Sequence, residues 1–353
     1  MGSLASRVVP ALLARAPREL VTKRAAERLR GLACQVALPV AGLALEVRLE
    51  DASDAVDIAA MVRPEQALLA RWAGPTGDDP PHDIVSAWQH LERFRECWVH
   101  PDSGRELRAA VPTVFLELDD RGSAGAFAMP HVFLGLDPPL EAGGVRSAVG
   151  VATHEPRTDR FRAVVLEALA RASGVKDDVL VSLATVLAAL PDDAVPLQLG
   201  TVRRERCEGR MLLFVPARRA LDCLERLGWP GQLAAVREAV RVTGVDDSFV
   251  NLHLAVVGGG VAPRLGIEVM LDGTSSAPVA RDVAALLARL VHLGGSPDKC
   301  RALTLWPGEE VLERAGRMSI SRRLSHVKIV VQPDAPTRVK AYLGALIKPT
   351  PAV

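Results

Sequence analysis

The chain has 353 residues, of which 43 are Lys or Arg and 42 are Asp or Glu, so its net charge is +1. This near balance argues against a dedicated nucleic-acid-binding protein, which usually carries a basic excess. The hydrophobic share of 49% argues against intrinsic disorder and allows a large core. The five cysteines are scattered, with no Cys-x-x-Cys pair, which predicts a reduced cytoplasmic protein with neither a disulfide framework nor a structural zinc site.

The N-terminal segment, residues 1–30, is predicted to form an amphipathic helix. Its apolar residues at helical spacing are Val8, Leu12, Leu13 and Leu20. The opening Met1-Gly2 sequence also fits a loose myristoylation pattern, so modification of Gly2 stays open. The Arg-rich character of the segment is shared with transit peptides. No run of about 18 uncharged apolar residues occurs, which predicts that the chain has no transmembrane helix.

Strand pairs separated by helical stretches follow along the chain. The predicted pairs are 32–38 with 43–49, 113–119 with 131–136, 197–202 with 210–215, 249–256 with 264–271, and 326–331 with 338–343. The predicted helices are 55–72, 84–98, 158–172, 176–190, 217–242 with a break at 228–231, 278–293 and 297–303. We expect one domain over residues 31–346 and a short tail at 347–353.

Strand pairs joined by short turns are antiparallel, which excludes a doubly wound parallel sheet and predicts an α/β protein of the α+β kind. An open sheet covered by helices on one face and a closed ten-stranded barrel with outer helices both satisfy the pattern. In the last pair, Val327 and Ile329 alternate with Lys328, so one face is apolar and the other polar. The apolar face would pack under the helices, and in a barrel the polar face would line a lumen wide enough for a ligand. We favour the barrel.

The closing strand pair resembles a hairpin of the dimethylallyltryptophan synthase type. The matching residues are Val327-Lys328-Ile329-Val330, Pro333 and Arg338-Val339-Lys340-Ala341-Tyr342-Leu343. Together with five strand pairs and outer helices, this hairpin makes the chain similar to the ABBA, or PT-barrel, prenyltransferases. A weaker match is Pro112-Thr113-Val114-Phe115-Leu116-Glu117.

The resemblance implies transfer of a prenyl group from an allylic diphosphate to an aromatic or peptide acceptor inside the lumen. It implies that five side chains bind the diphosphate: Lys328, Arg338, Lys340, Tyr342 and Arg264. Glu117 would accept the proton of the acceptor. We expect an acceptor pocket formed by Phe115, His131, Phe133 and Met270. No cofactor is expected to be required, no metal ligands are assigned, and a role for magnesium stays open.

Two other functions remain open. The barrel could be a non-catalytic module that binds a peptide or a metabolite. Alternatively, His253 and Glu268 could meet across the fourth strand pair and act in acid–base chemistry, with a pH dependence near the pKa of histidine. His131 could form a similar pair with Glu117. The chain also departs from the resemblance, because Tyr342 is its single tyrosine, whereas that family shields its cation with several.

Overall fold

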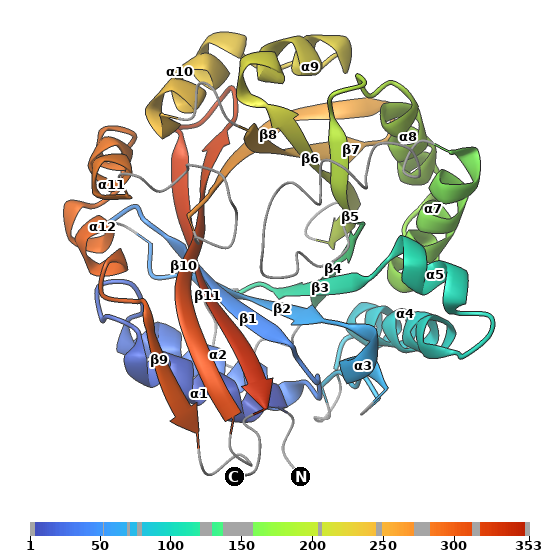
Figure 1. Cartoon of the computed structure of the whole chain (residues 1–353), viewed down its shortest axis with the longest axis horizontal. Coiled ribbons are helices and arrows are strands. Elements are labelled where there is room, and N and C mark those ends of the chain that lie inside the picture. The colour runs from blue at the N-terminus through green and yellow to red at the C-terminus, as the bar shows by residue number, and fades with distance from the viewer. Residues whose placement is uncertain are drawn as a thin grey trace.

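The computed structural model describes residues 4–51, 53–68, 71–75, 80–120, 129–136, 158–203, 207–244, 249–271, 283–312 and 318–349. Ten strands form a closed barrel in which all neighbours are antiparallel (Figure 1). They are β1 (Gly42–Arg48), β2 (Val56–Val62), β3 (Thr113–Leu118), β4 (Pro130–Gly135), β5 (Val195–Arg203), β6 (Cys207–Pro216), β7 (Phe249–Val257), β8 (Gly260–Met270), β10 (Met318–Val331) and β11 (Arg338–Pro349). The outer strand β9 (Gly308–Leu312) pairs with the first part of β10. The sequence prediction of a ten-stranded barrel is therefore confirmed.

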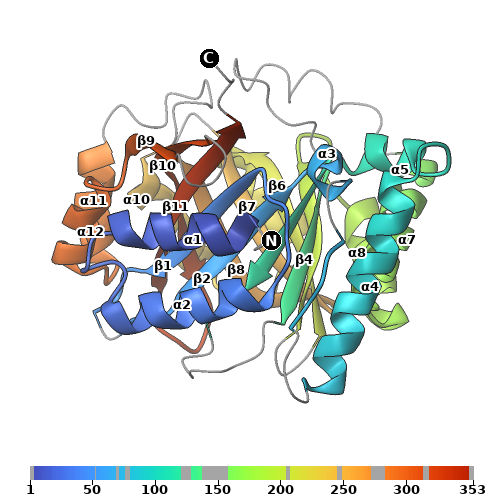
Figure 2. The same ribbon diagram turned by 90° about the horizontal axis from the view of Figure 1, so that it is seen from below.

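The helices form a ring outside the barrel (Figure 1). Their bounds are α1 (Leu4–Arg15), α2 (Lys23–Gln35), α3 (Pro64–Ala67), α4 (His82–Val99), α5 (Arg105–Ala110), α7 (Asp159–Ser173), α8 (Asp177–Ala188), α9 (Ala220–Arg226), α10 (Leu233–Thr243), α11 (Val283–His292) and α12 (Pro297–Leu303). The first two helices lie side by side across the outer face of the barrel near β1 and β2 (Figure 2). In the described part of the chain, no helix is long and apolar enough to cross a membrane.

The hydrophobic core fills the layer between the barrel and this helical ring. Along β10, Val327 and Ile329 are fully buried on the outer face, and Lys328 lies between them on the lumen face. The large side chains of Phe94 and Trp98 fill the same layer from α4. The two-residue alternation of the strands therefore separates an apolar outer face from a polar lumen, as the sequence predicted.

The first strand pair was placed wrongly from the sequence. Residues 32–38 are not a strand, because α2 runs to Gln35 and buries Leu29, Leu32 and Ala33 at helical spacing. The partner of β1 is instead β2, within the segment 55–72 that was predicted as a helix. The strand at 56–62 mixes the β-branched Val56, Ile58 and Val62 with the helix-favouring Ala59, Ala60 and Met61, so its identity depends on pairing with β1 and β3.

Two boundaries and one further strand also differ from the prediction. The segment 1–30 contains α1 and the start of α2, separated by a break that contains Pro17. Strand β11 continues to Pro349, past the predicted start of the tail at 347. Strand β9 was not predicted. Modification of Gly2 and residues 278–282 of the predicted helix 278–293 lie outside the described residues, and the division into domains stays a prediction.

Candidate functional site

The lumen contains two adjoining cavities. The larger has an empty volume of about 920 Å³ and the smaller about 410 Å³. Glu117, Phe133 and His253 line both cavities and therefore mark where they meet. Four cationic side chains and two carboxyl groups line the smaller cavity: Arg210, Arg264, Lys328, Lys340, Glu46 and Glu117. The larger cavity is bordered on one side by the small residues Gly42, Ala44, Ala59, Gly344 and Ala345.

Lys328 is the centre of one buried ionic cluster. Its Nζ lies 2.9 Å from Glu268 Oε1 and also contacts His253 Nδ1. Burial and the charge of Lys328 lower the pKa of His253 to about 3. Burial alone would raise the pKa of Glu268, but Lys328 and His253 hold it well below its usual range. At neutral pH His253 is therefore neutral and Glu268 is ionised.

This cluster argues against acid–base chemistry by His253 and Glu268. The structure does bring the two residues together, with His253 Nδ1 3.4 Å from Glu268 Oε1. However, neither group changes its protonation near neutral pH. A pH dependence near the ordinary pKa of histidine is therefore not expected from this pair.

Gly266 makes the Lys328 cluster possible. A Cβ at position 266 would lie 2.4 Å from Lys328 Cε and 3.2 Å from His253 Cβ. Because position 266 has no side chain, Lys328 can extend from β10 across β8 toward β7. Gly200 acts in a similar way on the opposite wall, since a Cβ there would lie 2.3 Å from the ring of Phe133.

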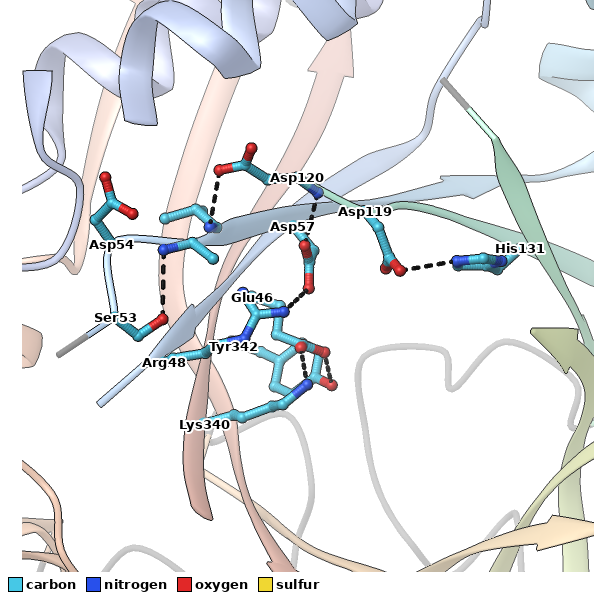
Figure 3. Close-up of polar contacts among 12 residues, drawn as sticks. Glu46, Arg48, Ser53, Asp54, Asp57, Asp119, Asp120, His131, Lys340 and Tyr342 are labelled. Carbon is cyan, nitrogen blue, oxygen red and sulfur yellow. Dashed lines mark hydrogen bonds and ion pairs between the residues drawn. The ribbon is translucent and has the colours of Figure 1, made fainter. Parts of the chain in front are cut away.

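A second cluster joins β11 to β1 (Figure 3). The Lys340 ammonium and the Tyr342 hydroxyl both donate hydrogen bonds to the carboxylate of Glu46. Burial alone would raise the pKa of Glu46, but the charges of Lys340 and Lys328 and these hydrogen bonds hold it well below its usual range. Burial and the negative charge of Glu46 raise the pKa of Tyr342 well above its usual range.

His326 lies beside this cluster and was not among the predicted site residues. A β-bulge between Leu324 and His326 turns both Ser325 and His326 toward the larger cavity. Ser325 Oγ is 3.0 Å from His326 Nδ1, and the His326 ring stacks on Tyr342. Sequence alternation places His326 on the same face as Lys328, but it does not indicate the bulge that orients His326.

Glu117 lies on β3, where it faces both cavities. Burial and the nearby charge of Glu46 raise its pKa to about 8, although Lys328 and Lys340 oppose this shift. Asp57 on β2 behaves similarly, because burial and Glu46 raise its pKa to about 7 against the charge of Arg48. Of the two, Glu117 is the group in contact with ligand space, so it is the candidate proton acceptor.

The polar network continues from Asp57 to the outside of the barrel (Figure 3). Asp57 Oδ2 pairs with Arg48 at 2.8 Å, and Asp57 Oδ1 accepts a hydrogen bond of 2.8 Å from the backbone N–H of Asp120. The carboxylate of Asp120 in turn accepts hydrogen bonds from Arg28 on α2, from Nε at 2.8 and 2.9 Å and from a terminal nitrogen at 2.7 Å. Arg28 on the outer helix α2 therefore helps to hold Asp120 and, through it, Asp57 in place.

The structure brings together only some of the residues that were predicted to bind the diphosphate. Lys328, Lys340 and Arg264 line the smaller cavity, and Tyr342 lines the larger one. Arg338 lies at the exposed start of β11 and lines neither cavity. Arg210, by contrast, is buried in the smaller cavity, although it was not among the residues predicted to bind the diphosphate. Glu46 was also not among the predicted site residues.

Of the four residues predicted to form the acceptor pocket, two line a cavity and two do not. Phe115 and Phe133 line the larger cavity. His131 is fully buried and lines neither cavity. Its Nδ1 accepts a hydrogen bond from the backbone N–H of Arg203, and its Nε2 lies 3.1 Å from Asp119. The predicted partner Glu117 is opposite in register, but Asp119 takes the contact. Met270 is the register partner of His326 and lines neither cavity.

No group of three or more His, Cys, Asp and Glu within the described ranges is arranged to hold a metal ion. The cationic side chains of the smaller cavity offer a different way to bind a multiply charged anion, because Arg and Lys donate directly to phosphate oxygens. The arrangement can therefore hold a phosphorylated ligand beside an aromatic-walled space.

The fold is that of the ABBA-type prenyltransferase barrel. The chain is similar to 5-dimethylallyltryptophan synthase from Streptomyces coelicolor, with 17% identity, coverage of 97% of this chain and 98% of that one, and a TM-score of 0.51. It is also similar to the apo form of the prenyltransferase PriB, with 15% identity, coverage of 97% and 96%, and a TM-score of 0.56. No protein-family model matches this sequence, and no curated protein matches it. At these identities the likeness shows the fold alone.

Proposed function

We propose that this chain is a prenyltransferase that moves a prenyl group from an allylic diphosphate to an aromatic or peptide acceptor inside the barrel. The observation that carries this proposal is the division of the lumen into a cationic cavity and an adjoining aromatic-walled cavity, with Glu117 facing both. The same fold has been crystallised as PriB with product diphosphate, and as PriB with L-tryptophan and dimethylallyl thiolodiphosphate.

In this proposal the diphosphate lies in the smaller cavity beside Lys328, Lys340, Arg210 and Arg264. The allylic C–O bond breaks and the diphosphate leaves with the bonding electrons. The fixed cations stabilise the charge that develops on it. Glu46 and Glu268 hold the two lysines in place before the ligand arrives.

The acceptor lies in the larger cavity against Phe115 and Phe133. Its electron pair forms the bond to the allylic carbon, and Glu117 in its ionised form takes the proton that the acceptor loses. The raised pKa of Glu117 favours this role, because a base is most effective when its pKa lies near the working pH.

The test is calorimetric binding of dimethylallyl thiolodiphosphate, with magnesium and with a chelator. Lys340→Ala and Arg264→Ala should each weaken binding about tenfold or more. Lys348→Ala is the matched control, because Lys348 is on the same strand but exposed. Equal binding with and without magnesium would show that the protein does not need magnesium to bind the diphosphate. No binding to the unmodified protein would overturn the proposal.

A second function, a non-catalytic peptide- or metabolite-binding module, is favoured by one observation. Tyr342 is the single tyrosine of the chain, so the lumen has few aromatic faces to stabilise a carbocation. Ligand binding without consumption of dimethylallyl diphosphate would identify this function. For either function we keep a cytoplasmic location as part of the proposal, because all five cysteines are free.

A further inference from the structure

Arg323 on β10 lines the larger cavity, far from the lysines of the smaller one. It lies opposite Gly344 in register, and Gly344 is four residues along β11 from Lys340. That separation corresponds to roughly 13 Å at a rise of about 3.3 Å per residue. The larger cavity therefore has its own cation at the end remote from the diphosphate position.

The charge of Arg323 is not balanced by a carboxylate among the described residues. Its one hydrogen bond there is from Nε to Ser321 Oγ, at 3.3 Å. Two carboxyl groups line the same cavity, but Glu268 is paired with Lys328, and Glu117 lies on β3, four strands away around the barrel. A half-buried guanidinium with this one hydrogen bond among the described residues has donors available for a ligand in the cavity.

The backbone at Arg323 is held rigidly from outside the barrel. The buried indole N–H of Trp306 donates to the carbonyl oxygens of both Arg323 and Gly344, at 3.1 and 3.2 Å. The neighbouring Arg322 points to the outer side, where its guanidinium lies 5.2 Å from the ring centroid of Trp306. The two adjacent arginines therefore lie on opposite sides of β10, with Arg322 packed on Trp306 and Arg323 facing the cavity.

Two hydroxyl groups lie on the same wall as Arg323. Ser321 and Ser325 flank it at two-residue spacing, and both line the larger cavity. A planar guanidinium with a hydroxyl on either side matches the geometry of a carboxylate, which accepts two parallel hydrogen bonds.

We propose that Arg323, with Ser321 and Ser325, binds a carboxylate on the ligand of the larger cavity and so selects acidic aromatic ligands over neutral ones of the same shape. The identification of this ligand as the prenyl acceptor rests on the proposed function. Its carboxylate would lie at the Arg323 end of the cavity, and its aromatic ring would extend toward Phe115 and Glu117.

The experiment compares two probes of the same shape, N-acetyl-L-tryptophan and N-acetyl-L-tryptophanamide, by calorimetry on the full chain. The unmodified protein should bind the acid more tightly than the amide. Arg323→Gln should weaken binding of the acid by roughly tenfold to a hundredfold and leave the amide unchanged. Arg323→Lys should restore part of the preference, because it keeps the charge without the planar fork. Arg322→Gln is the matched control and should keep the full preference.

Equal affinity of the unmodified protein for the two probes, or no binding of either at millimolar concentration, would overturn the inference. A preference that survives Arg323→Gln would do so as well. Binding of dimethylallyl thiolodiphosphate is measured in the same variants and should not change. If that analogue does not bind while the acid preference is present, the prenyltransferase proposal fails and the carboxylate site stands.

Discussion

Tyr342 on β11 and His326 on β10 are register partners whose rings stack, with centroids 3.8 Å apart and planes 19° from parallel. The stack lines the larger cavity, and the Tyr342 hydroxyl also holds Glu46. Because the chain has a single tyrosine, this stack supplies the aromatic face at this part of the lumen.

We expect Tyr342→Phe to keep the stack and Tyr342→Leu to remove it. In the proposed reaction, loss of the stack should let water capture the allylic cation. The ratio of dimethylallyl alcohol to prenylated product should then rise roughly threefold to thirtyfold in Tyr342→Leu, in line with the strength of cation–π attraction. Chromatographic measurement of the two products checks this. The same ratio in both variants would show that the ring has no shielding role.

Glu117 should control the pH dependence of the reaction. Its pKa is raised to about 8, and a proton acceptor must be ionised. We therefore expect kcat/KM to rise with pH through about 8 and to be lost as the pH falls below it. Glu117→Gln should lower the rate by about 10²- to 10⁴-fold and remove this rising limb. A variant that retains the limb would assign it to another group.

The same raised pKa values should make the fold less stable at alkaline pH. Glu117 and Asp57 titrate near 8 and 7 in the folded chain but near 4 when unfolded. The folded protein therefore binds more protons between these values, and the free energy of unfolding should decrease as pH rises from about 4.5 to 8. The groups with lowered pKa values, Glu46 and Glu268, lose their contribution only below this window.

Glu117→Gln should consequently be more stable than the unmodified protein at pH 8.5, by on the order of 1–3 kcal/mol, and about equal to it at pH 5. Denaturant unfolding at both pH values measures this difference. A variant that is less stable at pH 8.5 would show that Glu117 is a structural residue rather than a strained functional one.

Gly266→Ala should displace Lys328 without altering any charge. The added methyl group would lie 2.4 Å from Lys328 Cε, so the side chain must leave its position between His253 and Glu268. We expect about tenfold weaker binding of dimethylallyl thiolodiphosphate. Gly31→Ala on α2 is the control, because a Cβ there meets nothing within 4 Å. Unchanged binding in Gly266→Ala would exclude Lys328 from the anion site.

Alternation alone was sufficient to place Lys328, Lys340 and Tyr342 on the lumen face, because successive residues of a strand face opposite sides wherever no bulge interrupts it. The position of a residue along the barrel axis does not follow from alternation. Arg338 shares the face of Lys340 but lies at an exposed strand end. His131 similarly found its partner in Asp119 and not in its register partner Glu117.

The misplaced first strand pair had the largest effect on the candidate site. Because residues 55–72 were taken as a helix, Asp57 could not be recognised as a lumen residue. Glu46 lies on the neighbouring strand β1, and its contacts with Lys340 and Tyr342 cross the other edge of that strand, to β11. These contacts join residues almost 300 positions apart, and only closure of the barrel reveals them.

The link from Arg28 through Asp120 to Asp57 affects the design of N-terminally truncated forms of this protein. Helices α1 and α2 lie on the outer face of the barrel and contribute no strand to it. Arg28 on α2 nevertheless forms an ion pair with Asp120. A shortened protein that begins at Val36 would lack Arg28 and its hydrogen bonds to the Asp120 carboxylate, whose backbone N–H in turn donates to Asp57. We expect such a truncation to lose the ligand site as well as part of its stability, so an N-terminal affinity tag should be added ahead of these helices and not in their place.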